Sequence, residues 1–379
     1  MNPAGNSHLH FVQSIEPLHG GGLGRAALGL HEAFRAAGTD SLLVTTCGAT
    51  PQTPGKPGIS EFHRLGPAKL YYARGLQRDA CALVADDAIL HAHGFYVATN
   101  WIFGREARRR NRPIVSHVHG FFEPWILARS RTRKRVARAL FEDANARQTA
   151  LWRALTDTEA DQIRARGIRG PIVVAPNGVD LASDAEEAAI AQSRFTAPSR
   201  KRLVFLGRLH PKKGLDLLVP AWARHRSAAR DWELIVAGPD ELGYRATVEA
   251  LAAGCGVQDS VVFTGTVREA DKIALLRSAD AFILPSRSEG FSVAVLEAMA
   301  CRVPVAATRA CNFPNLAVDG GGWLCDTTLG SVADVIGRVL ASSDEERRDR
   351  GLAARRLVEQ RYGWPRIART ILDACAAHC

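Results

Sequence analysis

The chain has 379 residues, which corresponds to two domains, or at most three, of about 150 residues each. Hydrophobic residues make up 46% and charged residues 23%, and the mean hydropathy is -0.08, so a small disulfide scaffold and a mainly disordered chain are excluded. The formal net charge of +10 does not by itself distinguish among anionic lipids, phosphorylated substrates and nucleic acid as partners.

Short aliphatic runs alternate with longer segments of helical period in the first half, a pattern typical of strands followed by crossover helices. Apolar residues at three- and four-residue spacing predict an amphipathic helix over residues 23–37. We expect a cytoplasmic protein, because the start has no leader pattern and no apolar run reaches the roughly 18 residues that span a bilayer. The predicted strands of this half are residues 8–15, 41–47, 88–93, 113–119 and 171–175.

A glycine cluster opens the predicted helix. Glycines allow the backbone to approach a ligand closely, and the N–H groups at a helix start favour an anion. The spacing Gly22-x-Gly24-x-x-Ala27 meets the loose dinucleotide fingerprint, but the second strand ends without the acidic residue that this fingerprint requires for a ribose. The alternative is a tight turn without a ligand.

Two His-x-His pairs follow, each at the carboxyl end of a predicted strand: His91 with His93, and His117 with His119. A zinc site would need further ligands that the sequence does not identify, so a core role is favoured for His93 and His117. His119 stands directly before a glycine, and we expect it to contact substrate.

The positive charge is concentrated between residues 102 and 139, a segment with eleven basic and two acidic residues. A segment of this kind attracts anionic headgroups, phosphorylated substrates or nucleic acid. A solvated face of arginine-rich helices explains it equally well.

After Asp180 the strand character is lost, which predicts a linker or a surface helix before the alternation resumes. The pattern favours an α/β protein with two facing, doubly wound, Rossmann-like domains, residues 1–180 and 181–362. The tail is helical but interrupted around Gly363 and Pro365, so we expect residues 363–379 to return to the first domain. The predicted strands of the second half are residues 202–206, 232–237, 260–263, 281–284 and 303–306.

Arg208 and Lys213 lie in a loop between a predicted strand and helix. Arginine supplies a planar fork and lysine a mobile point charge, a pair that suits a diphosphate. An incidentally charged surface loop is the alternative. We expect Lys213 to be a solvated cation that contributes little to stability.

The segment over residues 285–300 is the most informative. A strand ends at Pro285, and a helix starts near Ser292, so its first amides form an anion site. Glu289 and Glu297 are eight residues apart and suit two different hydroxyl groups of one ligand better than general acid and base roles.

The eight cysteines have no C-x-x-C spacing and are expected to be reduced core residues. Cys375 and Cys379 are four residues apart in a helical pattern. They would bind a metal only with further ligands, which the neighbouring sequence does not contain.

Six motifs in order resemble the retaining, GT-B-fold glycosyltransferases of family four over almost the whole chain. The segments HGFFEPW and ALTDTEADQI resemble members that build bacterial surface polysaccharides. The six motifs are GGGLGRAALGLHEAF, VAPNGVD, GRLHPKKGLDLL, ELIVAGP, VVFTGTV and SEGFSVAVLEAMACRVPV.

For the second domain, the resemblance implies a nucleotide-sugar site. Arg208 and Lys213 would bind the donor diphosphate, Glu289 the donor sugar and Glu297 the nucleotide ribose. The strand end near Thr266 and Val267 would contact the base. The loop whose amides assist at the diphosphate comprises Gly290, Phe291, Ser292 and Val293.

For the first domain, the resemblance implies an acceptor side. His119 would lie beside the transferred sugar, and Gly21, Gly22 and Gly24 would approach the phosphates and the acceptor. The run Ser292-Val293-Ala294 departs from the small or proline-rich run common in the family, which leaves the donor sugar open.

The implied function is transfer of a sugar from a nucleotide diphosphate sugar to a saccharide, with retention and without a metal or other cofactor. A polyprenyl-diphosphate-linked acceptor would place residues 102–139 against the anionic inner membrane face, in exopolysaccharide or lipopolysaccharide biosynthesis. The alternatives are a nucleotide-sugar epimerase of similar fold and a basic nucleic-acid-binding protein. The latter is disfavoured because the basic run lacks interleaved aromatic residues and a recognition module.

Overall fold

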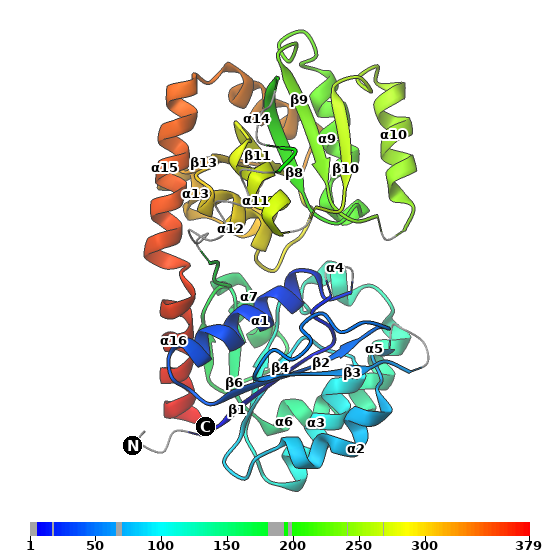
Figure 1. Cartoon of the computed structure of the whole chain (residues 1–379), viewed down its shortest axis with the longest axis vertical. Helices are drawn as coiled ribbons and strands as arrows, with labels where there is room; N and C mark the ends of the chain where they lie inside the picture. Colours follow the sequence, from blue (N-terminus) through cyan, green and yellow to red (C-terminus); the bar gives the residue numbers. More distant parts are fainter. Residues whose placement is uncertain are drawn as a thin grey trace. The chain divides into compact units, whose positions relative to one another are not determined.

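The computed structural model describes residues 6–16, 19–65, 70–180, 193–195, 199–240, 242–267 and 269–379. The chain divides into two compact units, Met1–Gly178 with Trp364–Cys379, and Val179–Gly363 (Figure 1). Most of the segment that the sequence predicts as a linker after Asp180 lies outside the described residues.

The first unit contains a seven-stranded parallel sheet. Two of its strands, β3 and β6, were not predicted from the sequence, because β3 is only partly buried and the arginine in β6 interrupts its apolar pattern. In spatial order the strands are β3 (Ile59–His63), β2 (Ser41–Cys47), β1 (His8–Val12), β4 (Ile89–His93), β5 (Ile114–His117), β6 (Thr149–Ala154) and β7 (Ile172–Val174).

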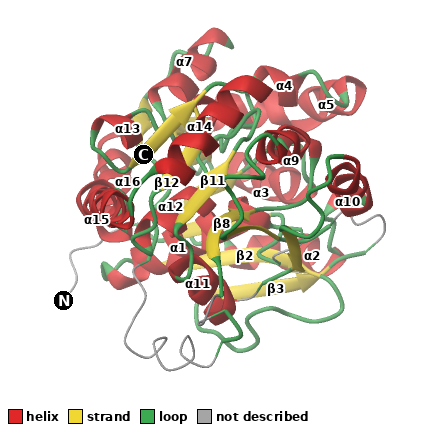
Figure 2. Ribbon diagram, turned by 90° about the horizontal axis from the view of Figure 1, so that it is seen from above, coloured by secondary structure: helices red, strands yellow, loops and turns green. Residues whose placement is uncertain are grey.

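Helices cover both faces of this sheet (Figures 1 and 2). Leu9 and Phe11 of β1 pack toward α2 and α3, whereas His8 and His10 point to the opposite face, against Phe34 of α1. Because side chains alternate along β1, one face of the sheet is apolar there and the other carries histidines. The helical segments of this unit are α1 (Gly21–Ala36), α2 (Arg74–Leu83), α3 (Ala98–Arg109), α4 (Pro124–Leu127), α5 (Arg131–Ala137), the π-helical turn η2 (Arg138–Glu142), α6 (Asp143–Gln148), α7 (Asp157–Ala165) and α16 (Trp364–His378).

The second unit contains a six-stranded parallel sheet, in the order β10 (Val261–Gly265), β9 (Trp232–Ala237), β8 (Lys201–Leu206), β11 (Ala281–Leu284), β12 (Val305–Thr308) and β13 (Gly322–Cys325). Strand β13 was not predicted from the sequence. The helical segments are η3 (Pro211–Lys213), α9 (Leu215–Ala223), α10 (Tyr244–Gly254), α11 (Glu269–Arg277), α12 (Val293–Ala300), η4 (Arg309–Cys311), α13 (Asn315–Val318), α14 (Leu329–Ala341) and α15 (Asp344–Arg361).

The tail forms α15 in the second unit and α16 in the first, with the break at Tyr362 and Gly363. Trp364 closes the return by packing on two glycines, because a Cβ atom at either Gly29 or Gly178 would lie 2.4 Å from its ring. The predicted fold class, two doubly wound α/β domains with a C-terminal helix that returns to the first, is confirmed. Among the described residues, no helix combines the length and the apolar character needed to cross a membrane.

Candidate functional site

Three glycines lie side by side at the carboxyl ends of β8, β9 and β10. The amide of Gly207 donates to the carbonyl of Ala237 at 3.0 Å, and the amide of Gly238 donates to the carbonyl of Gly265 at 2.9 Å. Gly238 has φ +142°, and a Cβ atom there would lie 1.9 Å from the Gly207 carbonyl oxygen. Only glycine permits this approach, which leaves the backbone at the sheet edge open to a ligand.

Lys213 ends the turn that follows β8. The next residue, Gly214, has φ +75°, and a Cβ atom there would lie 2.1 Å from the carbonyl oxygen of Pro285. This contact joins the loop after β8 to the loop after β11 and brings Lys213 Nζ to 2.6 Å from Glu289 Oε1. The two side chains are only 16% and 12% exposed, so the expectation that Lys213 is a solvated cation is wrong.

Glu289 is a buried carboxylate with several stabilising neighbours. Burial opposes its ionisation, but the charges of Lys213 and Lys212 and hydrogen bonds from Lys213 and Ser286 together lower its pKa below the usual value. Ser286 Oγ donates to Glu289 Oε1 at 2.6 Å. Asn312 Nδ2 donates to the backbone carbonyl of Glu289 at 2.5 Å, which fixes the loop as well as the side chain.

The loop after Glu289 leads into α12. Gly290 is held by a 3.0 Å hydrogen bond from Asn312 Nδ2 to its carbonyl, and the buried ring of Phe291 stacks on Phe313 with a 4.2 Å centroid separation. Ser292 caps the helix and accepts from the amide of Val295. The helix begins at Val293, so Phe291 lies before it rather than in its first turn, and the amides that favour an anion are those at the start of α12.

Glu297 lies in the second turn of α12. Its Oε1 accepts from Lys272 Nζ of α11 at 2.9 Å, and both side chains are nearly buried. The ion pair holds the carboxylate in one place. Sequence analysis did not single out Lys272, because it is one cation in an ordinary helical segment.

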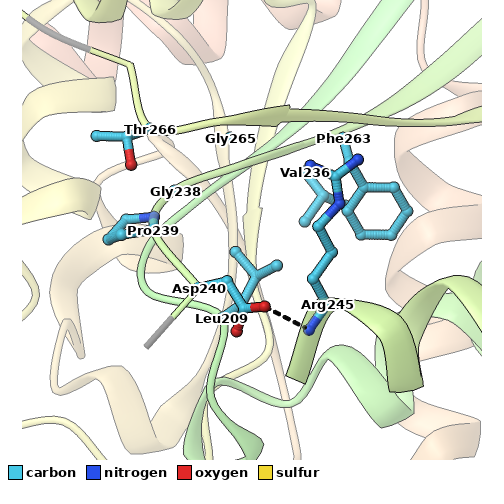
Figure 3. Close-up of a pocket in the computed structure, with 9 residues that line it drawn as sticks. All are labelled: Leu209, Val236, Gly238, Pro239, Asp240, Arg245, Phe263, Gly265 and Thr266. Atoms are coloured by element: carbon cyan, nitrogen blue, oxygen red, sulfur yellow. Dashed lines mark hydrogen bonds between the residues drawn. The ribbon is translucent and has the colours of Figure 1, made fainter. Parts of the chain in front are cut away.

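A pocket lies at the carboxyl ends of β9 and β10 (Figure 3). Arg245 lies over the ring of Phe263 at 5.4 Å, and its amide donates to Asp240 Oδ2 at 3.3 Å. Thr266 lies on the opposite side of the pocket from Arg245, and Val267 follows it in the chain. Exposed Arg208 directly precedes a residue of the pocket wall. The lining consists of Leu209, Val236, Gly238, Pro239, Asp240, Arg245, Phe263, Gly265 and Thr266.

In the first unit, the glycine turn forms the start of α1. A Cβ atom at Gly20 or Gly24 would lie 2.2 or 2.4 Å from the carbonyl oxygen of Ser14, so these two glycines allow the helix to pack against the end of β1. Gly21 has φ +51°, and Gly22 is exposed. Packing against β1 thus explains why residues 20 and 24 are glycines. Gly21 and Gly22 lie at the start of the helix, and this packing does not explain them.

Two rows of histidine rings cross β1, β4 and β5. In the first row, His91 Nε2 lies 2.8 Å from His8 Nδ1, and His91 Nδ1 lies 3.0 Å from His117 Nε2. In the second row, His93 Nε2 lies 3.1 Å from His10 Nδ1, and its Nδ1 lies 3.2 Å from His119 Nε2. Burial lowers the pKa of all six rings well below the usual histidine range, so each imidazole is neutral at pH 7.

His119 ends the second row just beyond β5. It is only partly buried, and its φ of +51° with that of Gly120 at +79° turns the backbone out of the strand. Glu159 of α7 accepts from the amide of Gly120 and, at 2.6 Å, from the amide of Leu155, so it holds this turn. Fully buried Arg153 of β6 lies 3.3 Å from His117 Nδ1 and ends the first row.

The predicted site residues thus form two groups, one in each unit. The structure brings Lys213 and Glu289 into direct contact, and it places Arg208, Thr266 and the start of α12 at the carboxyl edge of the same sheet. Sequence analysis missed five supporting residues, namely Ser286, Asn312, Lys272, Arg153 and Glu159. The sequence did contain a signal for the histidine rows. His8 and His10 form a third His-x-His pair, with the same spacing as the two pairs already noted.

Two Rossmann-like parallel domains, with cations and a helix start at the carboxyl edge of the second sheet, give the chain the GT-B fold. HepE of Anabaena, solved with UDP and glucose, has this fold with a TM-score of 0.79 and 20% identity, over 98% of this chain and 100% of that one. WaaG, a glycosyltransferase involved in lipopolysaccharide biosynthesis, matches with a TM-score of 0.71 and 18% identity over 96% and 99%.

The chain belongs to the glycosyltransferases, with a family 4 domain followed by a group 1 domain. It is an enzyme that uses a nucleotide-sugar donor. The model described as Glycosyltransferase Family 4 matches residues 20–183, and that described as Glycosyl transferases group 1 matches residues 187–357. A D-inositol 3-phosphate glycosyltransferase of Xylanimonas cellulosilytica is 30% identical over 94% of this chain and 91% of its own length. A GDP-mannose-dependent alpha-(1-6)-phosphatidylinositol monomannoside mannosyltransferase of Mycolicibacterium smegmatis is 31% identical over 63% of this chain and 64% of its own length.

Proposed function

We propose that this enzyme transfers a sugar, with retention of anomeric configuration, from a nucleoside diphosphate sugar to a saccharide acceptor linked to a lipid phosphate. The observation that carries the proposal is the buried Lys213–Glu289 pair beside the start of α12. In this assignment the second domain binds the donor and the first binds the acceptor. The product would enter an exopolysaccharide or lipopolysaccharide.

Charge develops on the diphosphate as the bond to the sugar C1 breaks. Arg208, Lys213 and the first amides of α12 supply fixed positive charge and dipoles for that leaving group, which stabilises the transition state more than the ground state. These groups take the electrostatic role that a metal ion fills in other transferases, so we propose that the step requires no metal. Glu289 would contact the donor sugar, and Glu297, held by Lys272, would bind the ribose.

Retention follows if the acceptor attacks from the face that the diphosphate leaves. The acceptor oxygen bonds to C1 as the phosphate oxygen departs, and the leaving phosphate takes the acceptor proton. His119, a neutral imidazole, would orient the transferred sugar by a hydrogen bond.

The pocket in Figure 3 suits the nucleotide base. Its wall combines apolar surface from Val236 and Phe263 with the backbone and hydroxyl groups around Thr266. A flat heterocycle needs this mixture of apolar contact and a few polar groups. We therefore assign Thr266 and Val267 to base contacts.

The acceptor is proposed to carry a phosphate. The relatives named above act, by their names, on inositol phosphate and phosphatidylinositol mannoside, and a polyprenyl diphosphate shares the same anionic group. The basic segment over residues 102–139 provides complementary charge in the first domain. Arg131, Arg135 and Arg138 are exposed there.

The same segment is proposed to bind an anionic membrane surface. Val136 of α5, within the segment, and Leu140 of η2, directly after it, are 53% and 70% exposed and lie four residues apart among these arginines. A helical surface with exposed apolar side chains among cations is typical of segments that lie in the headgroup region.

The transfer activity is tested by incubating the purified enzyme with a panel of nucleoside diphosphate sugars. We expect one donor to raise the melting temperature most and to be hydrolysed slowly without an acceptor. Addition of a lipid-linked saccharide extract should give a product whose anomeric configuration, read by NMR coupling constants, equals that of the donor. An inverted product would contradict retention, and an isomerised nucleotide sugar would indicate the epimerase alternative. Loss of turnover in chelator with the melting temperature unchanged would contradict the metal-free step.

The membrane proposal is tested with a triple variant, Arg131→Gln, Arg135→Gln and Leu140→Ser. We expect binding to vesicles that contain anionic lipid to weaken by more than tenfold, because each cation near the surface contributes about 1 kcal/mol. The control is Arg366→Gln with Arg369→Gln, which removes as much charge from exposed positions of α16. Equal affinity for neutral and anionic vesicles, or an equal effect of the control, would overturn the assignment.

A further inference from the structure

Two histidines and a cysteine meet inside the first domain, beneath its C-terminal helix. His8 begins β1, His91 lies in the middle of β4, and Cys375 lies near the end of α16. One nitrogen or sulfur atom of each lies within 4.8 Å of the other two. The three residues are 5%, 0% and 1% exposed, and none of them has a role in the proposed transfer reaction.

A fourth donor, Cys379, follows in the chain, outside the group of three whose ligand atoms lie within 4.8 Å of one another. Cys379 follows Cys375 by one helical turn, its amide donates to the Cys375 carbonyl at 2.8 Å, and the two thiols are hydrogen-bonded to each other. Cys379 is exposed, so an ion can reach the cluster from solvent along the end of the helix.

We propose that His8, His91, Cys375 and Cys379 form a structural binding site for a zinc-class divalent cation. Two imidazole nitrogens and two thiolates in a closed set are the ligands that such an ion takes in structural sites. The site is separate from the transfer reaction. Its role is to fasten α16 to β1 and β4 of the sheet.

The distance between the two imidazole nitrogens is close to the one that a tetrahedral ion requires. His8 Nδ1 and His91 Nε2 lie 2.8 Å apart and share one proton. Metal–nitrogen bonds of about 2.0–2.1 Å at a tetrahedral angle place two nitrogens about 3.3 Å apart. The two nitrogens therefore move apart by about half an ångström when the ion replaces the proton. The hydrogen bond between His91 Nδ1 and His117 Nε2, at 3.0 Å, holds the orientation of the His91 ring.

The surrounding charge favours this cluster over a second one in the same domain. Asp40 and Asp87 contribute negative potential at His8, and the two thiolates would neutralise a divalent ion. His93, His117 and His119 also approach one another within 4.8 Å. That group has no anionic donor and lies beside the buried guanidinium of Arg153, 3.3 Å from His117, which opposes a cation. The charge of Arg153 also acts on His91, but in the proposed site the two thiolates would offset it.

The experiment uses the full-length enzyme, stripped of metal with a chelator and kept reduced with a phosphine. Titration with Co²⁺ should give one equivalent of tetrahedral visible absorption with sulfur-to-cobalt charge transfer, which Zn²⁺ displaces. Zn²⁺ should raise the melting temperature of the first domain in the parent protein. Cys375→Ser should remove the charge-transfer band, and Cys379→Ser, at an exposed position, should reduce it to about half.

The matched control is Cys47→Ser, which removes another buried thiol of the same domain and should leave the cobalt spectrum unchanged. Circular dichroism of each metal-free variant shows whether it is folded, and Cys379→Ser keeps the test valid if Cys375→Ser does not fold. An unchanged charge-transfer band in Cys379→Ser, or the absence of stoichiometric Co²⁺ uptake by the parent protein, would overturn the proposal. Because sugar transfer is not expected to need the ion, activity of the stripped enzyme tests the proposed function independently.

Discussion

At the scale of single residues, the proposed donor site depends on charges that are paired and largely removed from solvent. Lys213 and Glu289 lie 2.6 Å apart with little exposed surface, and Glu297 is paired with Lys272 in the same way. Removing one partner of such a pair leaves an uncompensated buried charge, which costs far more than a surface ion pair contributes. A substitution at Lys213 should therefore affect both the stability of the fold and the proposed binding of the donor.

For this reason we expect Lys213→Ala to lower kcat/KM by about 10²–10³ and the free energy of unfolding by about 3 kcal/mol. The double variant Lys213→Met with Glu289→Gln removes both charges and should recover most of the stability but not the transfer rate. Denaturant titration and initial rates separate the two effects. The control is Lys201→Ala, which breaks an exposed pair with Asp344, and a recovery of turnover together with stability would refute the role in the reaction.

At the scale of elements, the sheet edge of the second domain depends on how closely neighbouring strand ends approach. Gly238→Ala would place a Cβ atom 1.9 Å from the Gly207 carbonyl oxygen at a φ of +142°. We expect it to lower the free energy of unfolding by about 1–3 kcal/mol and to weaken donor binding, since Gly238 also lines the pocket. Calorimetry with and without the donor measures both.

Gly254→Ala is the matched control, because Gly254 lies in α10 and a Cβ atom added there would meet no heavy atom within 4 Å. It should be neutral or stabilising by about 0.5–1 kcal/mol. Equal losses for the two substitutions would show that the close approach of the strand ends has no special importance.

At the scale of the whole molecule, the two domains should differ in acid stability. Burial lowers the pKa of His8 and His31 to about 4, and it lowers the pKa of His10, His91, His93, His117 and His119 well below 6.5. All seven lie in the first domain. Below pH 6.5 the unfolded domain binds more protons than the folded one, so the stability present above pH 6.5 falls toward pH 4.

The slope is at most about 1.4 kcal/mol per pH unit for each histidine. Glu142, whose burial raises its pKa to about 7, and Glu159, whose pKa is also raised by burial, act in the opposite direction but are outnumbered. We therefore expect the first domain to unfold before the second between pH 6.5 and pH 4, as resolved by hydrogen exchange at a series of pH values. His10→Phe should make the loss less steep, and unfolding of the second domain first would contradict this account.

The alternation of strands and helices in two domains, the return of the last helix and the cations and glycines in loops directly after strands could be predicted from the sequence. These features depend on local patterns: the alternation of apolar runs with helical periods, the break at Tyr362 and Gly363, and cations or glycines directly after strands. The missed strands β3, β6 and β13 show the limit. Their burial and pairing come from neighbouring strands rather than from their own short sequences.

Only the tertiary structure decided which side chains meet. Lys213 is 76 residues from Glu289, and His8 is 83 residues from His91, so no local pattern relates the members of either pair. The segment of Cys375 and Cys379 contains no other metal ligands, yet α16 places the buried Cys375 within 4.8 Å of His8 of β1 and His91 of β4. A parallel sheet brings residues from distant strands to one edge and one face. The sequence therefore shows which residue types each loop contains, but the contact partners, burial and charge state of those side chains follow only from the tertiary structure.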